Sequence, residues 1–200
     1  DRLRSRGLGD VYKRQGQGDV GSGKTAIAIL ALTKIVENGY QGALMAPTEV
    51  LAAQHFKTFQ QVFKGMPVKA AYLSGHTKAA ERKEILEQLK DGSIHILIGT
   101  HALIEENVVF SALGLVITDE QHRFGVKQRQ ALESKGKSPH VLIMTATPIP
   151  RTMALSVYGD LDVSFIKGMP PGRHPVKTYA VGSYMPVSYT HLTLPTTERV

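Results

Sequence analysis

The sequence of 200 residues contains no cysteine, and this absence removes several kinds of chemistry. Disulfide bonds, thiolate metal ligands and cysteine nucleophiles are all excluded. The eight histidines lack the H-x₃-H and H-E-x-x-H spacings that are typical of zinc sites, so no zinc centre is expected. No apolar run reaches the roughly 18 residues that a membrane span requires, and no secretory leader is evident. We therefore expect a cytoplasmic protein that has no membrane partner.

Positive charge exceeds negative charge, but the excess is unevenly distributed along the chain. The formal net charge is +7, of which +3 belongs to residues 1–15 and +4 to residues 16–182. A basic surface favours a polyanion such as nucleic acid as a partner. The moderate charge of residues 16–182 is by itself only a weak indication of nucleic-acid binding.

A glycine-rich segment with the pattern G-x-x-x-x-G-K-[ST] carries the strongest chemical signal. It comprises Gly18, Asp19, Val20, Gly21, Ser22, Gly23, Lys24 and Thr25. Glycines let consecutive backbone N–H groups surround phosphates, and the helix that begins at Lys24 directs its positive end at the same anion. The Lys24 ammonium would reach the β- and γ-phosphates, while the Thr25 hydroxyl would bind Mg²⁺. The alternative is a glycine-rich turn that only caps a helix.

Apolar runs that predict strands alternate with segments that predict helices. Strands are expected at residues 43–46, 68–73, 94–98, 115–117, 140–144 and 163–166, and helices at 24–37, 48–63, 77–91, 101–105, 126–134 and 150–158. The helix at 24–37 is apolar on all sides and is expected to be buried. Continuous apolar strands that alternate with helices are typical of an α/β domain with a mostly parallel sheet and helices on both faces.

Polar residues follow four of these strands, at the positions where the functional groups of a parallel sheet collect. The segments are residues 47–49, 99–101, 119–122 and 145–147. Asp119 is placed to hold Mg²⁺, and Glu120 to orient or deprotonate an attacking water. These adjacent carboxylates need not point the same way, because a strand bends where it ends. The alternative is a solvated strand end without a catalytic function.

Four motifs together resemble superfamily 2 helicases, and more narrowly the RecG family of bacterial ATP-dependent DNA helicases. They lie at residues 18–25, 46–55, 119–126 and 144–152. The segment Pro170–Val176 is also similar to that family, and the resemblance extends over residues 16–184. The transcription-repair coupling translocases share the stretch Pro148–Thr152 and stay open as the alternative family. The resemblance implies a RecA-like P-loop NTPase domain, the first of two motor domains, with ATP and Mg²⁺ as cofactors.

The resemblance also assigns roles to individual residues. Lys24 and Thr25 would bind MgATP, and Lys24, Asp119 and Glu120 would serve hydrolysis. Nucleotide sensing and coupling are implied for Gln121, His122, Thr145 and Thr147. Contacts with the DNA backbone are implied for Thr48, Thr100, His101 and Arg151. Ordinary structural roles stay open for this last group, such as a plain helix N-cap for Thr48.

Both ends of the chain depart from the family pattern. Residues 1–15 and 186–200 look like translated adaptor sequence, and natural divergent tails are the alternative. We expect residues 16–168 to form the ATP-binding domain and residues 169–185 to form a linker. The residues before Gly18 are not an apolar run. If the ends are foreign, we expect the first strand of the sheet to be missing, which would leave its neighbours without a backbone partner. We also expect the linker to lead toward a second motor domain that this chain lacks.

The predicted function is that of an ATP-binding and ATP-hydrolysing motor domain of a helicase that acts on branched DNA in recombination and repair. Its partners would be DNA, without sequence preference, and the second RecA-like domain of the full-length protein. The isolated fragment would have little activity, because the second domain supplies an arginine finger. Two alternatives stay open: the motor domain of a transcription-repair coupling translocase, and a nucleotide-dependent DNA-binding module without catalysis.

Overall fold

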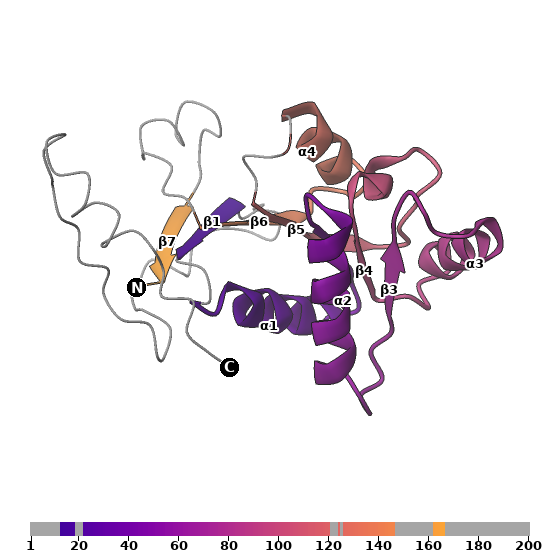
Figure 1. Cartoon of the computed structure of the whole chain (residues 1–200), viewed down its shortest axis with the longest axis horizontal. Helices are drawn as coiled ribbons and strands as arrows, with labels where there is room; N and C mark the ends of the chain where they lie inside the picture. Colours follow the sequence, from indigo (N-terminus) through magenta and orange to yellow (C-terminus); the bar gives the residue numbers. More distant parts are fainter. Residues whose placement is uncertain (1–12, 19–21, 121–123, 125, 147–161, 167–200) are drawn as a thin grey trace, which may run out of the picture. The chain divides into compact units, whose positions relative to one another are not determined.

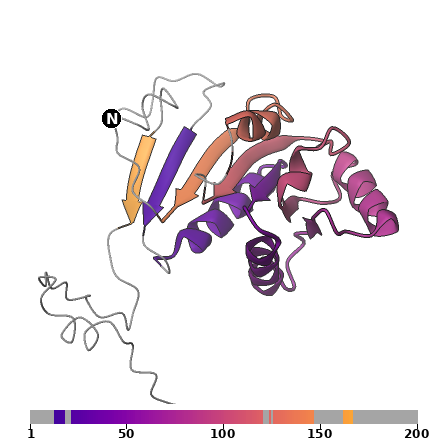
Figure 2. The same ribbon diagram turned by 45° about the horizontal axis from the view of Figure 1, so that its top comes forward.

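The computed structural model describes residues 13–18, 22–120, 124, 126–146 and 162–166. Its strands are β1 (Lys13–Gly18), β2 (Gln41–Met45), β3 (Ala70–Leu73), β4 (Ile96–Gly99), β5 (Leu113–Asp119), β6 (His140–Thr145) and β7 (Asp162–Ile166). They form one seven-stranded sheet in the order β3-β4-β2-β5-β6-β1-β7 (Figure 1). Every neighbouring pair of strands is parallel (Figure 2). The parallel sheet predicted from the sequence is confirmed.

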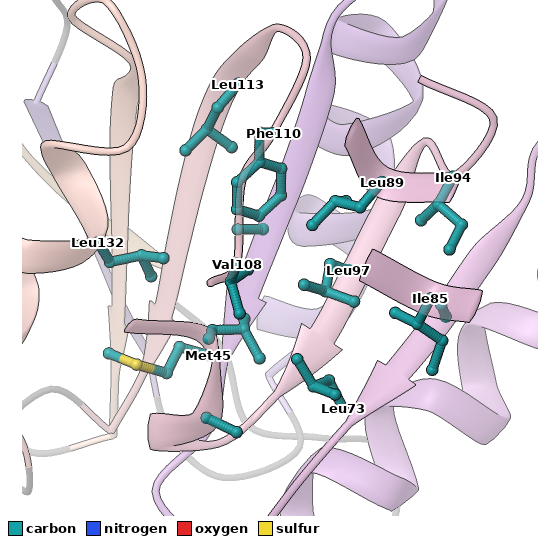
Figure 3. Close-up of a cluster of buried hydrophobic side chains, with 14 of the residues drawn as sticks. Met45, Leu73, Ile85, Leu89, Ile94, Leu97, Val108, Phe110, Leu113 and Leu132 are labelled. Carbon is teal, nitrogen blue, oxygen red and sulfur yellow. The ribbon is translucent and has the colours of Figure 1, made fainter. Parts of the chain in front are cut away.

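Helices pack on both faces of this sheet. They are α1 (Lys24–Glu37), α2 (Glu49–Val62), α3 (Ala79–Lys90), the 3₁₀ helix η1 (His101–Ile104) and α4 (Val126–Glu133). Successive strand side chains point to opposite faces, so the buried residues divide into two clusters. One cluster joins the sheet to α1 and α2 through Leu32 and Phe59. The other joins it to α3, η1 and α4 through Leu89, Leu103 and Leu132 (Figure 3).

Most predicted elements are present, but their ends are shifted. The strand expected at residues 115–117 extends from Leu113 to Asp119, because β2 and β6 flank it and pair with it beyond its apolar centre. The strand expected at residues 68–73 begins only at Ala70. The helix expected at residues 150–158 lies outside the described residues. Apolar content therefore located the elements, and strand pairing set their ends.

Helix α1 is less buried than its composition predicts. Ala28 and Leu32 are completely buried, but the side chains of Ile27 and Leu30 are 43% and 70% exposed. The expectation of a helix buried on all sides was wrong, because the sheet covers only one side of α1. Among the described residues, no helix is both long and apolar enough to cross a membrane.

Strand β1 corrects the expectation that the first strand is missing. Lys13–Gly18 pairs with β6 on one side and with β7 on the other. Ladder hydrogen bonds join backbone groups, which polar residues supply as well as apolar ones do. The polar side chains of β1 lower the stability of the fold, because Gln15 and Gln17 are buried and neither side-chain amide nitrogen has a hydrogen-bond partner. The lack of apolar residues before Gly18 therefore did not mean that the strand is absent.

Candidate nucleotide-binding site

Strand register places the P-loop and the two carboxylates at the same edge of the sheet. Strand β6 lies between β1 and β5, with Gln17 opposite Thr145 and Asp119 opposite Met144. Neighbouring strands are about 4.8 Å apart, so the ends of β1 and β5 are separated by roughly 10 Å. This span suits a triphosphate with its metal ion. The predicted meeting of these segments is found among the described residues.

Two glycines shape the described part of the P-loop. A Cβ atom on Gly18 would lie 2.5 Å from Ser22 Oγ and 3.0 Å from Ile166 Cβ, so a larger residue at the end of β1 would force these side chains to move. Gly23 has a φ of 92° and precedes α1 without a side-chain cap. The N-terminus of α1 is therefore open to an anion, with no side chain of Gly23 in the way. Residues 19–21 of the loop lie outside the described residues.

Lys24 folds back over the start of this loop. Its Nζ donates a hydrogen bond to the Gly18 carbonyl oxygen at 2.7 Å. The next residue, Thr25, is half-buried in the first turn of α1. The loop thus gathers an ammonium, a hydroxyl and a helix N-terminus, which is the set of groups that binds phosphates and their Mg²⁺.

Asp119 is held through both of its carboxylate oxygens. Its Oδ1 accepts a hydrogen bond from the Glu120 backbone N–H at 3.0 Å. Its Oδ2 lies 2.8 Å from Nε2 of His55, on α2. Asp119 and His55 are 9% and 8% exposed. The orientation of this carboxylate is therefore fixed by two neighbours.

The sequence-based prediction of the site missed His55. Ala52, His55 and Phe59 are the buried residues of α2, and their spacing of three and four places them on one helix face. A histidine in an otherwise apolar helix face needs a polar partner. That spacing was the available signal, but it could not indicate which strand end would supply the partner.

The carboxylates of Glu120 and Asp119 have different partners, as a bent strand end predicts. The Glu120 backbone has a φ of 49°, in the left-handed region that is unusual for a residue with a side chain. Its N–H also donates to the Met144 carbonyl oxygen at 2.9 Å. Its Oε1 accepts a hydrogen bond from the Ala146 N–H at 3.3 Å. Glu120 therefore connects the end of β5 to the segment that follows β6.

The donor set fits a magnesium ion that is bound together with phosphates. Within the described residues, no group of three or more His, Cys, Asp or Glu side chains could hold a metal on its own. Mg²⁺ commonly uses one or two carboxylates plus the oxygens of a substrate phosphate and water. The Thr25 hydroxyl and the Asp119 carboxylate would be the ligands that the protein contributes.

The expected DNA contacts have different environments. Thr48 is exposed and caps α2, since its Oγ1 accepts a hydrogen bond from the Leu51 N–H at 3.3 Å. His101 is exposed at the start of η1. Thr100 is only 2% exposed, and its hydroxyl has no hydrogen-bond partner. The backbone at Thr100 is extended, and the DNA contact expected of this residue stays a prediction.

A hydrogen-bonded pair, His76 and Glu49, includes the residue that follows Thr48. His76 Nδ1 is 2.9 Å from Oε1 of Glu49, the first residue of α2. The hydrogen bond from His76 is the main cause that lowers the pKa of the Glu49 carboxyl, and the charge of His76 adds to it.

Thr145 is completely buried at the end of β6. The remaining predicted site residues, Gln121, His122, Thr147 and Arg151, lie outside the described residues.

Comparison with known proteins identifies the family. The profile described as DEAD/DEAH box helicase matches residues 8–155. The chain belongs to the DEAD/DEAH box helicase family. Its parallel sheet with helices on both faces is the RecA-like fold predicted from the motifs.

Three relatives make the resemblance more specific. The ATP-dependent DNA helicase RecG of Bacillus subtilis is 58% identical over 165 residues, which cover 82% of this chain and 24% of that protein. The RecG of Aquifex aeolicus is 56% identical over 164 residues, covering 81% of this chain and 21% of that protein. A solved structure of RecG bound to a three-way DNA junction superposes with a TM-score of 0.74 and 46% identity, over 91% of this chain and 24% of that one. The predicted similarity to RecG helicases is confirmed, and the chain spans about a quarter of the length of these relatives.

Proposed function

We propose that this chain binds and hydrolyses MgATP as the first motor domain of a DNA helicase of the RecG type. The observation that carries the proposal is the meeting of the P-loop and the Asp119–Glu120 pair at one edge of the sheet. A glycine-rich turn that merely caps a helix needs no carboxylates two strands away. A binding module without catalysis needs no second carboxylate beside the one that holds the metal.

Each side chain then has a distinct task. Lys24 and the N-terminus of α1 would bind and neutralise the phosphates, and Thr25 with Asp119 would hold the metal ion. The Glu120 carboxylate would accept a proton from the attacking water or orient that water toward the γ-phosphate. The bond broken in hydrolysis would be the phosphoanhydride bond between the β- and γ-phosphates, with ADP as the leaving group. The contact of Glu120 with Ala146 offers a route by which a change at the nucleotide reaches the segment after β6.

DNA is the proposed polyanion partner, bound through its backbone and without sequence preference. The exposed positions Thr48 and His101 support this proposal, together with the net positive charge of the chain. Hydroxyl groups and helix starts bind phosphates of any sequence, which suits a motor that moves along DNA. Branched DNA is the proposed substrate because the RecG structure that resembles this chain holds a three-way junction.

We further propose that the chain alone has little hydrolytic activity. It spans 24% of the length of the Bacillus subtilis relative. In nucleoside triphosphatases that receive an arginine finger from a neighbouring domain or protein, this residue accelerates hydrolysis by about 10³–10⁵-fold. The second RecA-like domain of a full-length protein is therefore the proposed partner across the nucleotide.

The binding half of the proposal is tested on the chain itself with a fluorescent ATP analogue in the presence of Mg²⁺. Hydrogen bonds to charged groups are worth about 1.5–3 kcal/mol, so Lys24→Ala should weaken binding by about 10- to 100-fold. Lys34→Ala, an exposed lysine on the same helix, is the matched control and should leave binding unchanged. Equal affinity of the Lys24→Ala variant and the wild type would refute the nucleotide site.

The catalytic half is tested with Glu120→Gln, introduced into a full-length protein that contains this segment. ATP hydrolysis stimulated by a three-way DNA junction should fall by about 10²–10⁴-fold, since a positioned base contributes that much. Binding of the ATP analogue should stay within a few fold of the wild type. Unchanged hydrolysis would favour the alternative of a DNA-binding module without catalysis.

A further inference from the structure

We propose that His55 is a positioning residue that holds Asp119 in the orientation required for Mg²⁺, and that it ties this carboxylate to helix α2. The proposal rests on the proposed function, because it concerns how the metal ligand of that site is oriented. His55 itself touches neither the nucleotide nor the metal in this role. It would act only through the Asp119 carboxylate.

The contact is short and almost completely shielded from water. His55 Nε2 lies 2.8 Å from Asp119 Oδ2, and the two side chains are 10% and 13% exposed. Asp119 Oδ1 is occupied by the Glu120 N–H at 3.0 Å. With both oxygens held, the carboxylate cannot rotate without breaking a buried hydrogen bond, which is costly at this degree of burial.

The position of His55 within α2 gives this contact a wider consequence. Its neighbours on the same helix face, Ala52 and Phe59, are buried, and Phe59 belongs to the same apolar cluster as Ile117 of β5. Thr48, the exposed cap of α2, lies seven residues before His55, which is about 10 Å along the helix axis. A displacement of α2 caused at its exposed N-terminus would therefore move the group that holds Asp119.

The competing interpretation is a buried histidine that only satisfies a buried carboxylate. Three variants separate the two roles. His55→Leu removes the donor, His55→Gln retains an N–H donor at similar reach, and Phe59→Leu disturbs the same helix face without touching Asp119. The measurement is the Mg²⁺ concentration that gives half-maximal binding of a fluorescent ATP analogue.

If His55 positions the metal ligand, His55→Leu should raise the Mg²⁺ concentration for half-maximal binding by about 10- to 100-fold. This is the usual effect of losing a group that orients a metal ligand. His55→Gln should restore this concentration to within a few fold of the wild type. Phe59→Leu should lower the unfolding midpoint but leave the Mg²⁺ dependence unchanged. An equal shift with Phe59→Leu, or no shift with His55→Leu, would overturn the proposal.

A second measurement does not depend on nucleotide. Unfolding by urea of the wild type, His55→Leu, Asp119→Ala and the double variant forms a double-mutant cycle. If the two side chains are in direct contact, the change in the unfolding equilibrium constant of the double variant should differ on the order of tenfold from the product of the changes in the two single variants. Additive effects would overturn the contact itself.

Together the two measurements distinguish the failure of this inference from that of the proposed function. A non-additive cycle with an unchanged Mg²⁺ dependence overturns the positioning role and leaves the nucleotide site standing. A wild type that shows no Mg²⁺-dependent binding of the analogue overturns the proposed function, and the role of His55 falls with it.

Discussion

The carboxylate of Glu120 accepts a hydrogen bond from the backbone N–H of Ala146, with an Oε1–N distance of 3.3 Å. Glu120 adopts this position from a backbone with a φ of 49°, while its own N–H is bonded to Met144. A side chain in the left-handed region costs free energy, and such residues gather at functional sites. The end of β5 therefore combines local strain with a contact to the neighbouring strand end. This combination is expected of a segment that responds to bound nucleotide.

Replacing Glu120 can separate this strain from the chemistry of its carboxylate. Glu120→Ala and Glu120→Gly both lose the carboxylate, but only glycine adopts a φ of 49° without strain. Relief of about 1–2 kcal/mol exceeds the roughly 0.4–1 kcal/mol by which glycine favours the unfolded chain. The glycine variant should therefore be the more stable of the two, by up to about 1 kcal/mol in urea unfolding.

The same pair of substitutions at Glu81 provides the control. Glu81 is an exposed residue in the first turn of α3, where the backbone is helical. Glycine should there be the less stable variant, by about 1 kcal/mol. The same order of stability at both positions would contradict the idea of strain at Glu120.

The sequence was sufficient for the parts of this protein that depend on local pattern. Apolar runs located the strands, and the spacing from Gly18 to Thr25 indicated the phosphate loop. The chain direction of parallel strands then predicted that Asp119 and the loop would share one edge. These features need only short segments and one general rule about parallel sheets.

The features that the sequence did not reveal depend on residues far apart in the chain. The partner of Asp119 is His55, which lies 64 residues earlier, and no local pattern pairs them. Thr100 follows a strand as the other polar residues do, yet its side chain is buried. Strand β1 forms although its residues are polar, because β6 and β7 supply backbone partners on both sides.

The polar side chains of β1 predict an unusual stabilising substitution. Both amide atoms of Gln15 are buried without a hydrogen bond, a situation that costs about 1–3 kcal/mol for an unsatisfied group. Gln15→Leu, which has a similar volume, should raise the free energy of unfolding by that amount in urea titrations. The exposed residue Gln60 is the control, and Gln60→Leu should stay within about 0.5 kcal/mol of the wild type. A Gln15→Leu variant no more stable than Gln60→Leu would contradict the prediction.

The Glu49–His76 pair predicts a dependence of stability on pH. The hydrogen bond from His76 lowers the pKa of Glu49 from its ordinary value of 4.5. A carboxyl with a lowered pKa in the folded state stabilises the fold above its ordinary pKa, and this contribution disappears as the pH falls through the lowered value. The wild type should therefore lose more thermal stability between about pH 5 and pH 3 than Glu49→Gln does.

The effect should be small and should decrease with added salt, because the pair is exposed. Glu81→Gln serves as the control, since Glu81 also lies in the first turn of a helix. It accounts for the interaction of a first-turn carboxylate with the helix dipole. A pH dependence of Glu49→Gln equal to that of the wild type would show that the pair contributes nothing.

Gly99 predicts a severe packing defect at the edge of the sheet that carries the site. It ends β4, opposite Leu73 of β3, and a Cβ atom there would overlap the Leu73 carbonyl oxygen and the Leu103 side chain. A backbone oxygen cannot rotate away, so Gly99→Ala should separate the ends of β3 and β4 and lower the free energy of unfolding by about 3 kcal/mol.

Gly16 in β1 is the matched control, because its Cβ would have no heavy atom nearer than 3.8 Å. Gly16→Ala should be neutral or slightly stabilising, by up to about 1 kcal/mol. Similar unfolding midpoints for the two alanine variants would show that β3 and β4 are not packed as closely at Leu73 as this structure places them.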